Sequence, residues 1–209
     1  MNDLPFSPAA DRNKHAILEV MQRVLPAGGR MLEVASGTGQ HAAWLGANMP
    51  GWEWQPTETN STALPTIAAW ARQASATNVK APCLLNATDP QWPADDETLA
   101  SDFAQPFDAV SCSNMLHIAP WNACLGLVAG AARHLKPGGL LMIYGPFLEE
   151  GVVTTQSNLN FDASLRSQNP QWGLRQRVAV EAAAQLVGLV PIERIAMPAN
   201  NLMLVFRRA

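Results

Sequence analysis

The alternation of strand-like and helix-like segments is the feature that most constrains the fold. Short apolar runs of strand length occur at 30–35, 52–57, 81–86, 107–113, 140–144, 189–197 and 202–207. Segments with apolar residues at helical spacing occur at 15–25, 40–49, 61–76, 121–135 and 176–186. This alternation is typical of βαβ units, which build an α/β fold around a mainly parallel sheet. The short connection 198–201 predicts an antiparallel hairpin, so we expect one reversed strand at the end of the chain.

The composition limits the function. A chain of 209 residues with 48% apolar content suits one globular domain across 1–209, with an N-terminal arm and helix at 1–29. The net charge of −3 and the lack of a dense lysine and arginine cluster argue against extended nucleic-acid binding. The N-terminus does not read as a secretion signal, and no run reaches the ~18 apolar residues of a membrane span. We therefore expect a cytoplasmic protein.

Cysteine and histidine spacing predicts neither a disulfide framework nor a metal site. The three cysteines are odd in number and lie in apolar or helical surroundings, which favours a reducing compartment. The histidines are scattered, and neither an HxxxH nor a CxxC spacing is present.

A glycine turn follows the first predicted strand. Residues 37–39 read Gly-Thr-Gly and open a predicted helix. Glycine lets a ligand approach the main chain, and a helix start directs unpaired N–H groups at that ligand. A P-loop is excluded because the Gly-Lys-Ser/Thr ending is missing. Gly37, Gly39 and Ala42 fit a dinucleotide-binding pattern with Glu58 19 residues after Gly39, so that alternative stays open.

Glu33, at the end of the same strand, helps to distinguish a dinucleotide ligand from a cationic one. A negative charge is unfavourable beside a pyrophosphate and favourable beside an ammonium or sulfonium group. S-adenosylmethionine (SAM) carries both of these cations and no phosphate. Either Glu33 attracts this cofactor, or it is a strand-end carboxylate paired with a helix terminus.

Further cofactor contacts are expected after the second and third strands. Glu58 can accept hydrogen bonds from both hydroxyls of a ribose, and its alternative is a solvated loop acid. Asn86 and Ala87 can read the adenine edge through an amide and a main-chain N–H, with Asp89 as a rival. These positions complete an adenosine site at one edge of the sheet.

The N-terminal arm and the fourth strand add candidates. Arg12 and Asn13 either fold over the cofactor and reach its carboxylate, or begin the first helix. Asn114 lies at the carboxyl end of the fourth strand, where ligands bind in open α/β sheets. His117 is either a base with a pKa suited to neutral pH or a packing histidine.

Residues 146–175 break the alternation and are expected to be irregular. A segment of this length between regular elements predicts a lid or a substrate cradle above the cofactor, and its alternative is an ordinary surface loop. With the preceding strand it offers an apolar wall and polar groups: Tyr144, Asn158, Phe161, Arg166, Trp172 and Arg175. The two arginines suit a carboxylate or phosphate on the substrate.

The stretch 32–39 resembles the first motif of class I SAM-dependent methyltransferases. Segment 107–117 resembles their fourth motif, and 135–139 resembles the turn before their fifth strand. The resemblance implies a Rossmann-like α/β fold with a seven-stranded sheet ordered 3-2-1-4-5-7-6, strand 7 antiparallel, and helices on both faces. It also places Ala35, Gly37 and Gly39 against the cofactor. The family usually has glycine at the position of Ala35, so this chain adds a methyl group there.

A narrower resemblance is carried by four further segments. Residues 9–14, 117–121, 160–166 and 172–175 resemble a methyltransferase-like family of unknown function found in bacteria and animals. The leading functional hypothesis is SAM-dependent methyl transfer to a small, anionic molecule. The alternatives are a SAM-binding sensor or partner subunit without catalysis and, third, an NAD-dependent oxidoreductase.

Overall fold

The computed structural model describes residues 4–93 and 103–209 and has a seven-stranded central sheet. Its strands are β1 Gly29–Val34, β2 Trp52–Glu58, β3 Cys83–Leu84, β4 Phe107–Ser113, β5 Leu135–Gly145, β8 Leu189–Met197 and β9 Asn201–Arg208. The helices are α1 Pro8–Val24, α2 Gln40–Asn48, α3 Leu64–Gln73, α5 Trp121–His134, α6 Gln156–Gln168 and α7 Arg177–Gln185. A separate small sheet pairs β6 Phe147–Leu148 with β7 Arg175–Gln176. Short 3₁₀ helices are η1 Ser61–Ala63, η2 Leu116–Ile118 and η3 Pro198–Asn200.

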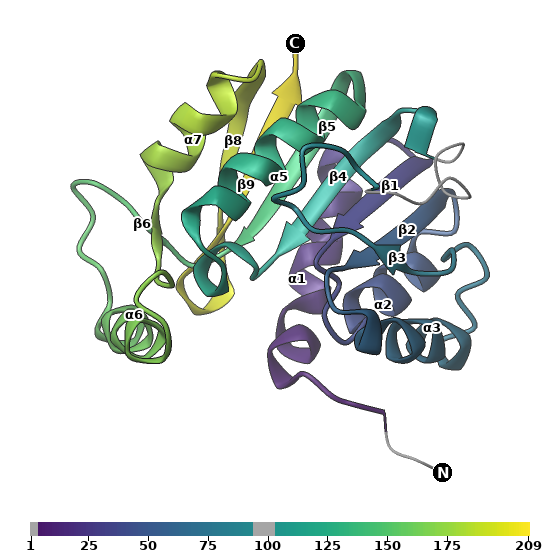
Figure 1. Ribbon diagram of the computed structural model, residues 1–209, viewed down its shortest axis with the longest axis horizontal. Helices are drawn as coiled ribbons and strands as arrows, with labels where there is room; N and C mark the ends of the chain where they lie inside the picture. The colour runs from purple at the N-terminus through teal and green to yellow at the C-terminus, as the bar shows by residue number, and fades with distance from the viewer. Residues whose placement is uncertain (1–3, 94–102) are drawn as a thin grey trace.

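The strand order confirms the topology that the sequence predicted. The order is β3-β2-β1-β4-β5-β9-β8, which is 3-2-1-4-5-7-6 when the strands of this sheet are counted along the chain. The first five strands are parallel, and β9 runs antiparallel to both β5 and β8. Figure 1 shows α5 and α7 on the face of the sheet toward the viewer and α1 on the far face. The carboxyl ends of the parallel strands therefore meet at one edge, where a ligand site is expected.

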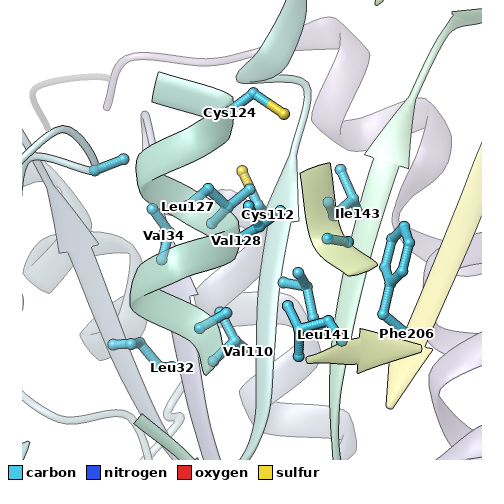
Figure 2. Close-up of a cluster of buried hydrophobic side chains, with 14 of the residues drawn as sticks. Leu32, Val34, Val110, Cys112, Cys124, Leu127, Val128, Leu141, Ile143 and Phe206 are labelled. Carbon is cyan, nitrogen blue, oxygen red and sulfur yellow. The ribbon is translucent and has the colours of Figure 1, made fainter. Parts of the chain in front are cut away.

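An apolar cluster joins the sheet to α5. Alternate residues of β1, β4 and β5 point to this face because successive side chains of a strand point to opposite sides. Figure 2 shows these strand side chains packed against successive turns of α5, with Phe206 of β9 beside them. The labelled side chains, all buried, are Leu32, Val34, Val110, Cys112, Cys124, Leu127, Val128, Leu141, Ile143 and Phe206. Each buried Leu, Ile, Val or Phe here stabilises the fold by about 1.5–3 kcal/mol.

A second apolar cluster lies between the sheet and α1 and α2. Trp52 and Trp54 of β2 are buried there with Ile17, Met21 and Leu45. The Trp52 indole donates to the Pro26 carbonyl oxygen over 3.2 Å. Both tryptophans are therefore packing residues of this cluster. Helix α1 is thus fixed against the same sheet edge from which the site is built.

Two sequence predictions about secondary structure were wrong. Helix α1 begins at Pro8 instead of residue 15, because the Ser7 hydroxyl caps it by accepting from the Ala10 N–H and Pro8 suits the first helical position. Segment 146–175 is not irregular, since it contains α6 and the β6–β7 pair. Helix α6 escaped prediction because among its residues only Leu165 is buried, which leaves no apolar periodicity to read.

Smaller differences concern strand ends. Strand β3 is two residues long instead of the six expected at 81–86, and β5 already begins at Leu135, before the predicted turn. The pairing of β4 with β5 shifts register between Phe107 and Ala109, which accommodates that turn, and Gly138 in it has φ +77°. The connection through η3 joins β8 to β9 as an antiparallel hairpin, as predicted. Of the polar connection predicted from 87 to 105, residues 94–102 lie outside the described part.

Candidate functional site

A cavity of about 700 Å³ opens at the carboxyl ends of β1, β2 and β4, and we call it the glycine-turn cavity. This volume is in the range of small-molecule and cofactor sites. Six of the residues predicted to bind a cofactor line it: Ala35, Gly37, Glu58, Asn86, Ala87 and Asn114. Glu33, Gly39, Arg12 and Asn13, which were predicted with them, do not line it.

The backbone of the turn explains its two glycines. Gly37 and Gly39 have φ values of +58° and +86°, a region that L residues with side chains rarely adopt. A Cβ on Gly39 would lie 2.6 Å from the Ile67 Cα, so this glycine allows α2 and α3 to pack closely. A Cβ on Gly37 would meet nothing within 4 Å. Gly37 therefore presents main chain to open space at the cavity wall.

Ala35 has the backbone conformation of a glycine. Its φ is +61°, although it carries a side chain, and it lines the glycine-turn cavity. A left-handed conformation costs an alanine roughly 1–2 kcal/mol. The departure from the methyltransferase motif thus changes the residue and keeps the glycine-like backbone.

The Glu58 carboxylate is fixed by main-chain donors. Its Oε2 accepts from the Gly37 N–H over 2.8 Å, and its Oε1 accepts from the Thr59 N–H over 2.8 Å. One hydrogen bond on each oxygen leaves lone pairs for further donors. Glu58 also lines the glycine-turn cavity, so its position at the cavity wall is fixed by these two bonds.

Glu33 lies behind the cavity wall and is only 3% exposed. Its Oε2 accepts from the Trp54 indole and from the Ser36 hydroxyl, both over 3.1 Å. These partners differ from the helix terminus that was the alternative in the sequence analysis. Burial raises the pKa of Glu33 to about 7, against the lowering effect of the two hydrogen bonds. A cation bound nearby would favour its charged form.

The third strand contributes the far end of the cavity. The Asn86 Oδ1 accepts from the Thr88 N–H over 3.0 Å and from the Thr88 hydroxyl over 2.9 Å. Only the Nδ2 donor of Asn86 is left for a ligand. Ala87 is buried, and Gly126 of α5 packs against its carbonyl, where a Cβ would lie 2.0 Å from the oxygen.

A second cavity of about 650 Å³ lies beside the first, and we call it the α6 cavity. Ser7, Asn114 and Ile118 line both cavities and form their common boundary. The remaining lining residues come from α1, η2, β5, α6 and the β8–β9 connection. They include these sequence candidates: Arg12, Asn13, His117, Tyr144, Asn158 and Phe161.

Asn13 links side chains of the two cavities. Its Oδ1 lies 2.7 Å from the Nε2 of His41, which lines the glycine-turn cavity. Asn13 also hydrogen-bonds the hydroxyl of Tyr144, which lines the α6 cavity. Burial lowers the pKa of His41 to about 4, so this imidazole is neutral at physiological pH. Arg12 and Asn13 lie within α1, which begins at Pro8, so they do not begin the first helix as one sequence alternative had it.

His117 and Asn114 converge at the boundary. A Cβ on Gly145 would lie 3.7 Å from both the Asn114 Oδ1 and the His117 Nδ1. The His117 ring meets Phe161 edge-on, with ring centroids 5.3 Å apart. Burial, helped by the charge of Arg175, lowers the pKa of His117 to about 4. The imidazole is neutral at physiological pH, the form in which it can accept a proton.

The structure does not bring Arg166, Trp172 and Arg175 into either cavity. Arg166 pairs with Asp162 one turn away, with 2.8 Å between Nε and Oδ2. The Arg175 guanidinium donates to the carbonyl oxygens of Leu116, Ala119 and Gln171. These two arginines brace the segment instead of facing a ligand, so the sequence argument for an anion site at Arg166 and Arg175 loses its basis.

Sequence reasoning missed several lining residues. Ser7, His41 and five residues between 118 and 123 line the glycine-turn cavity, and Asn201 lines the α6 cavity. The five residues are Ile118, Ala119, Pro120, Asn122 and Ala123. His41 could have been suspected, because it stands two residues after Gly39. Ile118, Ala119 and Pro120 lie in the segment 117–121 that carries the narrower resemblance, but that resemblance assigned them no role. The remaining positions belong to no motif.

Two kinds of site have no counterpart in the part of the chain that the structure describes. Over residues 4–93 and 103–209, no three or more His, Cys, Asp and Glu side chains gather in a way that could hold a metal ion. Within those same ranges, none of the helices has the length and apolar character that crossing a bilayer requires.

Several solved structures share the fold of this chain. An O-methyltransferase family 2 protein from Planctomyces limnophilus, in complex with apigenin, matches with a TM-score of 0.71 and 19% identity over 94% of this chain and 62% of that one. A methyltransferase of calicheamicin biosynthesis, with S-adenosylhomocysteine (SAH) bound, matches with a TM-score of 0.70 and 15% identity over 93% and 54%. A solved structure from Bacillus halodurans matches with a TM-score of 0.68 and 13% identity over 92% of this chain and 99% of that one. The fold is that of class I methyltransferases.

The family follows from the sequence match. Residues 4–208 match the family model described as a protein of unknown function, DUF938, and the chain belongs to that family. The chain spans less than two thirds of the length of the first two solved proteins named above.

Proposed function

We propose that this protein transfers a methyl group from SAM to a small molecule. The observation that carries the proposal is the charge of the glycine-turn cavity. Among the described residues that line it, Glu58 is the only charged one, and neither lysine nor arginine is present. A net cationic cofactor suits such a cavity, whereas the pyrophosphate of a dinucleotide would find no cation there.

The residues present fit this cofactor. Glu58, held by Gly37 and Thr59, would accept the ribose hydroxyls, and the walls at Asn86 and Ala87 would contact the adenine. SAM supplies a methyl group on a sulfonium, and transfer forms a bond from an acceptor lone pair to the methyl carbon while the carbon–sulfur electron pair returns to sulfur. The α6 cavity would hold and align the methyl acceptor. Neutral His117 would take up the proton that the methyl acceptor releases.

Calorimetric titration with SAM, SAH and NADH tests the cofactor. We expect SAM and SAH to bind and NADH not to bind; NADH binding without SAH binding would favour the oxidoreductase. Radiolabelled methyl transfer into a metabolite extract, separated by charge, then tests the reaction. SAM binding with no transfer above background would favour a sensor or partner subunit. The proposal keeps the anionic acceptor that was predicted from the sequence. Its support comes from Arg12, which lines the α6 cavity, instead of from Arg166 and Arg175.

A further inference from the structure

Arg12 is the one charged side chain among the described residues that line the α6 cavity, and it lines that cavity without an ion-pair partner. On the same helix, the neighbouring Asp11 is engaged by Lys14 at 2.5 Å. Among the described residues, neither an aspartate nor a glutamate lines the cavity. An arginine that faces a cavity without an acid beside it is a binding group for a carboxylate or phosphate.

The positive charge of Arg12 acts on Tyr144, which also lines the α6 cavity. Burial raises the pKa of Tyr144, and the positive charge of Arg12 opposes this rise, as does the hydrogen bond with Asn13. The guanidinium thus lies close enough to the Tyr144 hydroxyl to act on its charge. Arg12 and Tyr144 both line the α6 cavity.

The rest of the wall is apolar. Phe161 and Ile118 line the cavity and are 40% and 47% exposed. Two prolines, Pro146 and Pro198, also line it. A ligand with an apolar body would cover these surfaces and remove them from water.

Several other polar groups of the wall are already committed. The Asn158 amide donates to the Asn200 carbonyl oxygen, and the Asn201 amide donates to those of Pro198 and Ala199. Their donors do not compete with Arg12 for an anion. A single uncommitted cation matches one negative charge, which favours a carboxylate over a phosphate dianion.

From this arrangement we propose that the α6 cavity binds a small organic acid with an apolar, ring-sized body, and that Arg12 holds its carboxylate. The proposal rests on the proposed function in taking this acid as the methyl acceptor. It assigns to Arg12 a role different from contact with the cofactor carboxylate, because Arg12 lines the α6 cavity and not the glycine-turn cavity.

The test uses three ligands of one shape: benzoate, benzamide and benzamidine. Dissociation constants are measured by ligand-observed NMR on the full chain, with and without saturating SAH. We expect benzoate to bind at least ten-fold more tightly than benzamide, and benzamidine to bind most weakly. Phenyl phosphate, titrated in parallel, should bind more weakly than benzoate. Benzoate binding no tighter than benzamide binding, or tighter binding of phenyl phosphate, overturns the proposal.

Variants assign the effect to Arg12. Arg12→Gln should weaken benzoate at least ten-fold and leave benzamide and SAH unchanged, while Arg12→Lys should keep part of the preference for the anion. Arg23→Gln is the matched control, because Arg23 is on the same helix, exposed, and lines neither cavity. A loss of SAH affinity in Arg12→Gln with benzoate unchanged would place Arg12 on the cofactor and overturn the proposal. Failure of SAH to bind the wild type would refute the proposed function, and benzoate measured without SAH would still report on Arg12.

Discussion

The glycine-turn cavity and the α6 cavity share a boundary at Asn114 but are assembled differently. The first is built largely from residues at or just beyond the ends of β1, β2 and β4, and its one charged residue among those described is an acid, Glu58. The second draws on α1, η2, β5, α6 and the β8–β9 connection, and the one charged residue in its described lining is a base, Arg12. The position of the first cavity thus follows from the sheet topology, whereas the second depends on how segments distant in sequence pack together.

The largest expected effect is on the rate of methyl transfer, and it comes from a residue that lines only the α6 cavity. His117→Gln is expected to lower the rate of methyl transfer about 100- to 10,000-fold, because a positioned base contributes about this much. SAH affinity should not change, since His117 lines only the α6 cavity. The pKa of His117 lies near 4, so the wild-type rate should be level with respect to this group above about pH 5 and fall as it is protonated below that.

Radiolabel transfer and SAH calorimetry check this prediction. His15→Gln is the control, because His15 is exposed on α1 and lines neither cavity. A full rate in His117→Gln would show that His117 is a packing residue.

The next effect concerns the acid behind the glycine-turn cavity. The folded-state pKa of Glu33, about 7, lies above the ordinary 4.5, so between these values the folded protein holds a proton that the unfolded chain has released. This contribution to stability is complete below pH 4.5 and is lost as the pH rises through 7. Relative to Glu33→Gln, the wild type should lose about 3 kcal/mol of unfolding free energy between pH 4.5 and 8.

Urea unfolding of both proteins at matched pH values measures this difference. The comparison cancels His41 and His117, whose lowered pKa values act in the opposite direction and are common to both proteins. Parallel stability curves would mean that Glu33 is charged throughout this pH range.

A comparable effect on binding is expected at Glu58. Glu58→Ala removes an acceptor for two ribose hydroxyls, and hydrogen bonds to a charged group contribute about 1.5–3 kcal/mol each. We expect SAH to bind about 100-fold more weakly and benzoate to bind the α6 cavity as before. Calorimetry of this variant beside Glu19→Ala, an exposed acid outside both cavities, provides the check. Equal loss of both ligands would indicate that the glycine turn itself has collapsed.

The smallest effect tests the backbone at Ala35. Ala35→Gly removes a left-handed strain of roughly 1–2 kcal/mol and adds about 0.4–1 kcal/mol of unfolded-chain entropy. The variant should therefore be more stable by about 0.5–1 kcal/mol. Ala182→Gly, at an exposed position within α7, should be less stable by about 1 kcal/mol. Thermal unfolding of the pair checks the contrast, and a loss of stability in both would mean that Ala35 is not strained.

The sheet and the glycine-turn cavity were largely predictable because their signals are local. A strand followed at once by Gly37-Thr38-Gly39 places these residues at the end of β1, and Glu58 ends the next strand. The parallel sheet then brings such strand ends to one edge without any further information. Six cofactor candidates were found on this cavity for that reason.

The α6 cavity was predicted only in part. Tyr144, Asn158 and Phe161 line it as expected, but Arg166 and Arg175 were chosen by charge alone, and their partners cannot be read from a sequence. Arg12 was considered for the cofactor instead, because the start of α1 was placed too late. Such errors arise where a site depends on how segments distant in sequence pack together.

The boundary at Ser7, Asn114 and Ile118 has a consequence for the two ligands. Asn114 has φ +62° and donates its N–H to the Tyr144 carbonyl oxygen over 2.8 Å, so its position is tied to both cavities. Under the proposed function, a shift of this wall by one ligand would change the affinity for the other. By thermodynamic linkage, the factor by which the cofactor changes acceptor affinity must equal the factor by which the acceptor changes cofactor affinity.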